Sequence, residues 1–278
     1  MRSRGRVAAL LRALALVALG AILATAVGAL AKKSPPRPAK PQPSPPVSIR
    51  PTGVGVPEIG AQGTVGISDL AASLRSYHDG GQYESDLGTV DGQARAFMLR
   101  QANALRQKRK RRCAHKGAKR QRGRATAACA PLKLAIVLDI DETSLSNYTQ
   151  LNLNDFGNAS AALAVAAVAG TSPAIAPTLD LYRRARAAGI SVFAITGRPS
   201  VIETQTRQNL DGAGYADLAG IFFKPSGEAV IPFKSGQRAA LEGQGYRIVA
   251  NVGDQESDLA GGHADRSFKL PNPFYFIS

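Results

Sequence analysis

The sequence predicts an α/β fold in which helices cover a doubly wound parallel sheet. Two observations carry this prediction. From residue 131 onward, short apolar runs alternate with amphipathic helical stretches, an alternation typical of β-α-β units with right-handed crossovers. The first run, residues 132–141 (LKLAIVLDID), stays apolar up to its terminal acids, as expected of a strand buried on both faces. Parallel sheets of this kind bind their ligands at the carboxyl ends of the strands.

The other elements follow from the same periodicities. Helices are predicted over residues 178–189, 200–214, 235–245 and 255–262, and strands over 190–198, 221–224 and 246–254. Two further helices precede the sheet region, over residues 67–81 and from residue 90 into a basic run. An Ala-rich segment between residues 147 and 177 predicts a short helix beside the site, too small for a large cap domain. The site should therefore be fairly open.

The N-terminal 31 residues have the pattern of an export signal. Basic residues in MRSRGR precede an uncharged, mostly apolar run over 13–30, and Ala29 to Ala31 form an A-x-A cleavage site. The alternative is an uncleaved membrane anchor over residues 7–31. Either way the rest of the chain leaves the cytoplasm, secreted or attached to the cell envelope. Residues 32–65 follow as a Pro-rich linker, and residues 66–278 form the folded domain.

The positive charge of the chain is concentrated in one segment. The sequence holds 35 Lys and Arg against 20 Asp and Glu, a net charge of +15. Residues 106–124 carry eleven basic and no acidic side chains, whereas residues 125–278 carry 12 basic and 14 acidic ones. This distribution argues against a nucleic-acid-binding core. The basic insertion over 106–124 is expected to be a solvated excursion that either contacts an anionic cell-envelope surface or has no specific partner.

Cys113 and Cys129 are the only cysteines, and they bracket most of the basic insertion. Disulfides persist outside the cytoplasm, so export predicts a bond between them. A metal site at Cys113 and His115 lacks two further ligands at zinc spacing.

Polar residues follow three of the predicted strands. The first strand ends in Asp139 and Asp141, the second in Thr196, and the fourth in Asp254, with Asp258 one helical turn later. Carboxylates this close repel unless a cation balances them, and Mg²⁺ prefers carboxylates, water and a phosphate oxygen. The sequence therefore predicts a magnesium site formed by Asp139, Asp254 and Asp258.

These residues also suit phosphoryl transfer. Asp139 would be the nucleophile that forms an aspartyl phosphate, and Asp141 the general acid and base. Thr196 and a lysine would bind the phosphoryl oxygens; Lys234 is the candidate and Lys224 its competitor. Two arginines, Arg198 and Arg238, are equally well explained as phosphate contacts or as solvated helix residues.

The segments LAIVLDIDET, AITGR, FKSGQR and NVGDQESDL, in this order and spacing, resemble the four motifs of the haloacid dehalogenase superfamily. They are most similar to its acid phosphatase branch, subfamily IIIB, which includes plant vegetative storage proteins and bacterial outer-membrane acid phosphatases. The resemblance implies a haloacid dehalogenase-like Rossmannoid sheet with N-terminal helices and a minimal cap. It also implies the roles given above for Asp139, Asp141, Thr196, Lys234, Asp254 and Asp258, with metal bound at Asp141 through its main-chain carbonyl group.

Together these observations lead us to expect an exported, Mg²⁺-dependent acid phosphatase that hydrolyses small phosphomonoesters. A 5′-nucleotidase of the same fold is the alternative among enzymes. A surface-binding protein that uses the basic insertion is the alternative outside enzymology, and the intact pair Asp139 and Asp141 counts against it.

Overall fold

The computed structural model describes residues 48–50, 58–60, 67–117 and 129–277. The predicted export signal or anchor lies outside these residues, as does most of the predicted linker. Within the linker region, β1 (Ser48–Arg50) and β2 (Glu58–Gly60) pair antiparallel. Across the described ranges, no helix is both long and apolar enough to cross a membrane.

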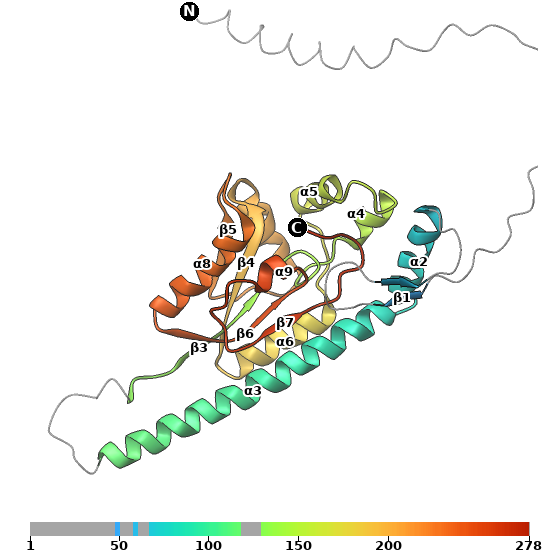
Figure 1. Ribbon diagram of the computed structural model, residues 1–278. Helices are drawn as coiled ribbons and strands as arrows, with labels where there is room; N and C mark the ends of the chain where they lie inside the picture. The colour runs from blue at the N-terminus through green and yellow to red at the C-terminus, as the bar shows by residue number, and fades with distance from the viewer. Residues whose placement is uncertain (1–47, 51–57, 61–66, 118–128, 278) are drawn as a thin grey trace, which may run out of the picture. The chain divides into compact units, whose positions relative to one another are not determined.

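Five strands of the described residues form one sheet in the order β5-β4-β3-β6-β7, with every neighbouring pair parallel (Figure 1). They are β3 (Lys133–Leu138), β4 (Ser191–Pro199), β5 (Gly220–Lys224), β6 (Tyr246–Gly253) and β7 (Ser267–Lys269). The chain moves from β3 outward to β4 and β5, then returns to place β6 on the other side of β3. This arrangement confirms the predicted doubly wound sheet, and it puts a topological switch point between β3 and β6.

Helices cover both faces of the sheet (Figure 1). On one face, α3 (Gln82–Gly117) and α6 (Ala176–Ala187) contact each other and contribute Met98 and Leu181 to the main buried cluster. On the other face, α8 (Val230–Gly243) contributes Phe233 and Leu241 to a second cluster. The residues of β3 alternate between the two clusters. Ile136, for example, belongs to the main cluster, and its neighbour Val137 belongs to the second. The strand is therefore buried on both sides, as its continuous apolar run predicted.

The two N-terminal helices differ in length from the prediction. The first, α2 (Ile67–Asp79), covers most of the predicted range. The second, α3, begins at Gln82 and continues to Gly117, so it contains the first part of the basic insertion. Residues 106–117 of the predicted basic insertion are helical, and the side chains of Lys108, Lys110, Arg111 and Arg112 are exposed to solvent. Arg, Lys, Gln and Ala are strong helix formers, and this composition prolongs the helix despite the repulsion between its charges.

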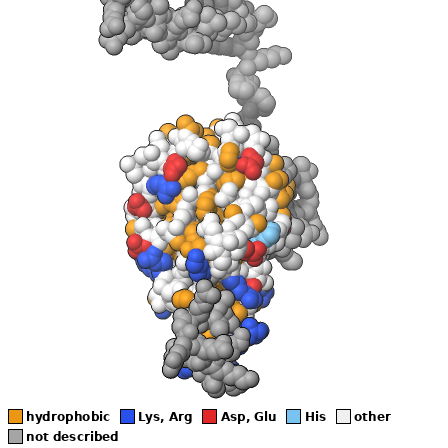
Figure 2. Space-filling model, turned by 90° about the vertical axis from the view of Figure 1, so that its left-hand side faces the viewer, with side chains coloured by type: hydrophobic (Ala, Val, Ile, Leu, Met, Phe, Trp, Pro, Cys, Tyr) orange, Lys and Arg blue, Asp and Glu red, His pale blue; other side chains and the backbone are white. Residues whose placement is uncertain are grey.

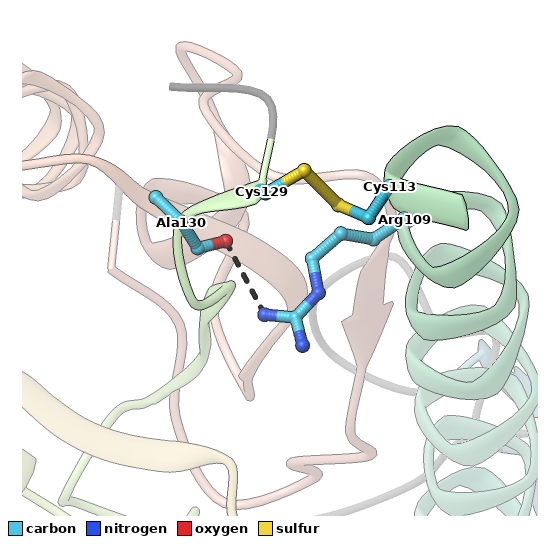
Figure 3. The surroundings of a disulfide bond; sticks show 4 residues. All are labelled: Arg109, Cys113, Cys129 and Ala130. Atoms are coloured by element: carbon cyan, nitrogen blue, oxygen red, sulfur yellow. Dashed lines mark hydrogen bonds between the residues drawn. A yellow bond between two sulfur atoms is a disulfide. The ribbon is translucent and has the colours of Figure 1, made fainter. Parts of the chain in front are cut away.

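The predicted disulfide between Cys113 and Cys129 is confirmed (Figure 3). Cys113 lies in the last turns of α3, and Cys129 lies shortly before β3. Beside the bond, Arg109 of α3 donates a hydrogen bond to the main-chain carbonyl oxygen of Ala130 at 3.2 Å. The end of the long helix is thus attached to the chain that enters the first strand of the sheet.

The Ala-rich segment forms two short helices, α4 (Tyr148–Leu153) and α5 (Ala159–Ala169). The N-terminus of α5 is capped by Asn158, whose side chain accepts a hydrogen bond from the main-chain N–H of Ala161. Its C-terminus ends at Gly170, which adopts the left-handed conformation with φ 63°. The helix contacts α7 (Glu203–Gly212), which follows the short turn η3 (Ser200–Ile202). In Figure 1 the C-terminal segment of the chain also lies near α5.

Candidate functional site

Three acidic side chains meet at the carboxyl edge of the sheet, at the switch point. Asp139 directly follows β3, Asp254 directly follows β6, and Asp258 lies in the short helix α9 (Glu256–Leu259). One carboxylate oxygen of each lies within 4.8 Å of the other two. All three residues are buried, with 6%, 1% and 4% of their surface exposed. The structure therefore brings together the three carboxylates that the sequence assigned to a metal site.

Lys234, from α8, is the cation of this acidic cluster. Its Nζ donates to Oδ1 of Asp139 at 2.5 Å and to Oδ1 of Asp258 at 2.6 Å. The lysine is buried as well, so both ion pairs are shielded from water. Lys224, the competing candidate, instead donates to two main-chain carbonyl groups of its own loop, at 3.2 and 2.8 Å. Of the two lysines, Lys234 is the one that the structure places among the acids.

The protonation equilibria reflect an excess of buried negative charge. Burial raises the pKa of Asp139 well above its ordinary value, and the charge of Asp258 raises it further, against the opposing effect of Lys234. Burial, followed by the charge of Asp258, raises the pKa of Asp254 to about 6. For Lys234, burial alone would lower the pKa, but the charges of Asp139 and Asp258 outweigh it and the pKa rises. Lys234 contacts two of the three carboxylates, and the oxygens of all three suit a hard divalent cation such as Mg²⁺.

Asp141 lies beside the cluster and is held by two side chains. The guanidinium group of Arg198 contacts both of its carboxylate oxygens, with N–O distances of 2.7 and 3.1 Å, and Nδ2 of Asn147 donates to Oδ1 at 2.7 Å. Arg198 is only 4% exposed. Arg198 is therefore not a solvated helix residue but a buried partner of Asp141. It also lines the cavity described below, so a phosphate contact stays a prediction.

Glu142 forms a second polar layer behind Asp141, and sequence reasoning missed it. Its carboxylate accepts hydrogen bonds from the main-chain N–H of Asn147 at 2.5 Å and from the hydroxyl group of Tyr275 at 3.0 Å. Burial, and then the charge of Asp141, raises the pKa of Glu142 to about 8. The residue has a φ of 49°, in the left-handed region that non-glycine residues seldom adopt. This turn allows Asp141 and Glu142 to share Asn147 as a donor.

Asp254 is oriented by three neutral donors. Oδ1 accepts from Thr143 at 3.0 Å, while Oδ2 accepts from Gln255 at 2.6 Å and from Asn272 at 2.8 Å. Asn272 belongs to the C-terminal segment. These hydrogen bonds orient the carboxylate without neutralising its charge, as is usual for a carboxylate that binds a metal ion.

Asp258 has two functions in the structure. It caps the N-terminus of α9 through the main-chain N–H of Gln255, at 2.9 Å, and it also joins the ion pair with Lys234. Gly253 is required here, because a Cβ atom at that position would lie 2.4 Å from Cβ of Asp258. Asp258 therefore combines a capping contact with its place in the acidic cluster that the sequence assigned to a metal.

The two remaining residues differ in position. Thr196, predicted to bind phosphate, is fully buried at the carboxyl end of β4, where Oγ1 accepts a hydrogen bond from the main-chain N–H of Arg198 at 3.1 Å. Arg238, predicted as a phosphate contact or a solvated residue, is neither. It is fully buried and donates to the main-chain carbonyl groups of Asp258, Ala260 and Gly262, so it stabilises the loop that presents Asp258.

A cavity of about 340 Å³ opens above these groups. Its floor contains the polar residues Asp139, Asp141, Arg198, Lys234, Asp254 and Asp258. Its walls come from α5, from the segment after β4, from the start of α8 and from the C-terminal segment. Among the described residues, α5 contributes four residues to the lining, consistent with the small cap predicted from the Ala-rich segment.

Comparison with known proteins gives a consistent picture. A family model described as HAD superfamily, subfamily IIIB (acid phosphatase) matches residues 68–278. Acid phosphatase 1 of Solanum lycopersicum is 37% identical over 153 residues, which cover 51% of this chain and 58% of that protein. The stem 28 kDa glycoprotein of Glycine max is 39% identical over 114 residues, covering 39% and 45%. The chain thus spans about half the length of the curated relatives it matches.

Vegetative storage protein 1 of Arabidopsis thaliana is similar over the same extent, with 33% identity over 147 residues that cover 51% of this chain and 54% of that protein. Among solved structures, the class C acid phosphatase from Bacillus anthracis with tungstate bound superposes with a TM-score of 0.50. It is 18% identical and covers 76% of this chain and 86% of its own. At that identity the likeness supports the fold alone.

Proposed function

The chain belongs to the HAD superfamily, subfamily IIIB (acid phosphatase), as its four motifs indicated, and from this premise we propose that it is an exported, Mg²⁺-dependent phosphatase of phosphomonoesters. The observation that carries the proposal is the acidic cluster with its single lysine. Asp139, Asp254, Asp258 and Lys234 lie together, buried, on the floor of an open cavity. A phosphate group can enter this cavity from solvent and reach the buried acids and the lysine.

The reaction proceeds in two displacements. A carboxylate oxygen of Asp139 attacks phosphorus, the bond between phosphorus and the alcohol oxygen breaks, and Asp141 gives its proton to that oxygen. Water then attacks the aspartyl phosphate while Asp141 takes a proton from it, and inorganic phosphate leaves as the bond to Asp139 breaks. Arg198 and Asn147 keep Asp141 facing the cavity through both steps.

The phosphoryl group needs positive partners while its charge redistributes. Lys234 faces Asp139 from α8, and Thr196 lies toward the carboxyl end of β4; these two would bind the phosphoryl oxygens. Asp139, Asp254 and Asp258 would hold Mg²⁺, together with the main-chain carbonyl group of Asp141 that the family pattern implies. When bound, the cation would supply Lewis-acid stabilisation to the transferring group.

Hydrolysis of p-nitrophenyl phosphate tests the proposal. We expect activity with Mg²⁺, none in excess chelator, and a fall in kcat of at least about a thousandfold for Asp139→Asn. Asp211→Asn, an exposed acid on α7, serves as the matched control and should keep full activity. Near-normal turnover of Asp139→Asn would refute the aspartyl-phosphate mechanism.

Metal binding is measured separately from activity. Isothermal titration of Mg²⁺ into the metal-free protein should give one site, and Asp254→Asn should weaken it by at least about tenfold, because a carboxylate ligand is lost. An unchanged affinity in this variant would remove Asp254 from the metal site.

Export is supported by the N-terminal signal pattern and by the Cys113–Cys129 bond. Mass spectrometry of protein recovered outside the cytoplasm should give a mature chain that begins at residue 32 if the signal is cleaved. A chain that still contains residues 7–31 would instead identify the membrane anchor.

The C-terminal part of α3 is our candidate for contact with an anionic envelope surface. Lys and Arg side chains gather at the lower part of the face drawn in Figure 2, and Lys108, Arg111 and Arg112 are all exposed. Since each basic residue near an anionic membrane contributes about 1 kcal/mol, replacing all three by Gln should lower retention on phosphatidylserine vesicles roughly a hundredfold. Equal retention of both proteins at low salt would refute the contact.

A further inference from the structure

The cavity over the proposed site has walls of a different chemistry from its floor. Four residues of α5 line it, Leu163, Ala164, Ala167 and Val168, and the lining also includes Ile202, Val230 and Ile277. All of these side chains are aliphatic. Two of them continue the apolar surface outward, because Val168 is 58% exposed and Ile277 40% exposed. A substrate whose phosphate reaches the floor must therefore lay its alcohol part against hydrocarbon.

The charged groups of the lining already have partners, which for Asp254 are neutral donors. Lys234 contacts Asp139 and Asp258, while Arg198 contacts Asp141. They belong to the floor, where they would meet the phosphate and the bond that breaks.

The neutral polar groups are also confined to the floor. Gln255 donates to Asp254 and accepts from the main-chain N–H of Ile277. Among the described residues, Ser257 is the lining side chain whose buried hydroxyl oxygen has no hydrogen-bond partner, and it adjoins Asp258 in α9. Tyr275, the remaining polar residue of the lining, donates its hydroxyl hydrogen to Glu142. Among the described residues, the walls thus offer no unengaged polar side chain that could recognise a sugar hydroxyl or the edge of a nucleobase.

We infer that the preferred substrates are phosphomonoesters of aliphatic alcohols, whose hydrocarbon chain packs between α5 and the C-terminal segment. This inference rests on the proposed phosphatase function and specifies its substrate class. Polar alcohol parts would lose water on entering and find no partner, which costs binding free energy. A hydrocarbon chain gains from the same burial.

A series of linear alkyl phosphates tests the inference, each used below its micelle-forming concentration with Mg²⁺ present. From ethyl to hexyl phosphate, kcat/KM should rise by up to about fourfold for each added methylene group, the factor expected for complete burial of that group. Hexyl phosphate should exceed adenosine 5′-monophosphate and glucose 6-phosphate. A kcat/KM that does not change with chain length, or a preference for either polar ester, would overturn the inference.

Two valines of α5 provide a matched pair of variants. Val168 lines the cavity, whereas Val165, one turn earlier and 55% exposed, does not. We expect Val168→Asn to lower kcat/KM for hexyl phosphate about fivefold and to leave ethyl phosphate within twofold of the unmodified protein. Val165→Asn should change neither. Equal effects of the two variants, or an equal loss for both esters, would refute the role of α5.

The experiment separates this inference from the proposed function. Hydrolysis of ethyl phosphate without any dependence on chain length leaves the phosphatase function standing and removes only the aliphatic preference. If no ester is hydrolysed by a folded, Mg²⁺-loaded protein, the proposed function fails and the inference fails with it.

Discussion

Asp91 should make the fold less stable as the pH rises, which is opposite to the effect of an acid whose pKa is lowered by folding. The residue lies in α3, is 3% exposed, and accepts one hydrogen bond on Oδ2, from Thr178 of α6 at 2.9 Å. Within the described ranges, Oδ1 is buried and has no hydrogen-bond partner. Burial raises the pKa of Asp91 from 3.8 to about 7, although the bond from Thr178 and the charge of Arg95 both oppose this rise. The folded protein therefore holds a neutral carboxylic acid at Asp91 when the unfolded chain is already ionised.

The sign of the effect follows from proton binding. Below pH 4 both states keep the proton, and Asp91 causes no loss of stability. As the pH rises from about 4 to about 7, only the unfolded state releases it, so the free energy of unfolding falls. Above pH 7 the loss is complete, and a pKa difference of roughly three corresponds to roughly 4 kcal/mol.

Asp91→Asn tests this directly, because asparagine does not ionise. Urea unfolding followed by circular dichroism, at half-unit steps from pH 4 to pH 8, gives the free energy of unfolding of each protein. Between pH 4 and pH 8, the free energy of unfolding of the variant should rise by roughly 4 kcal/mol relative to that of the original protein. Asp180→Asn is the matched control, since this carboxylate lies in the same helix contact but is 44% exposed; its profile should change by less than about 1 kcal/mol. Parallel profiles for Asp91→Asn and the original protein would refute the reasoning.

Three further substitutions address packing and charge. Lys234→Met should destabilise the metal-free protein by about 3–5 kcal/mol at pH 8, since it leaves buried carboxylates without their ammonium partner. In a urea titration, added Mg²⁺ should restore part of the lost free energy of unfolding. An unchanged free energy of unfolding in this variant would show that the ion pairs are not needed for stability. Arg238→Gln removes donors from buried carbonyl groups and should lower the melting temperature by several degrees, which an unchanged calorimetric transition would contradict. Cys113→Ser opens a loop of 16 residues and should cost about 3 kcal/mol in oxidising buffer, whereas the two proteins should unfold alike once both are reduced.

The strand-end acids could be predicted because local sequence and topology agree there. Asp139 and Asp254 each follow an apolar run, and the rules for parallel sheets bring carboxyl ends to one edge. Predicting the role of Lys234 required information beyond its local sequence, since nothing local distinguishes it from Lys224. Only the order of the motifs favoured it, and the structure then placed it between Asp139 and Asp258.

Other parts of the fold carry too weak a local signal. The strand β7 has only three residues, too short for an alternating pattern to be recognised. The beginning of α3 contains Gly88 and several polar residues, which conceal the spacing of the buried Tyr83 and Leu87. Its helical conformation there is stabilised by packing against the core rather than by propensity.

The partners that orient the site could not be found from sequence at all. Tyr275 meets Glu142 across 133 residues, and Asn272 meets Asp254 from the C-terminal segment. These are single contacts between distant segments, and no periodicity or spacing encodes them. Arg198 is a similar case, because its position near the carboxyl end of β4 was evident but its pairing with Asp141 depends on three-dimensional distances.

The bond between Cys113 and Cys129 has a consequence for cleavage of the chain by proteases. Lys119, Arg120, Arg122 and Arg124 lie between the two cysteines, in sequences that trypsin-like proteases recognise. A single cut there divides the polypeptide into two fragments, but the sulfur atoms still join them. Because α3 also contacts α6 and β6, the nicked protein keeps its long helix on the sheet. Proteolysis at these residues would therefore separate the fragments only after reduction.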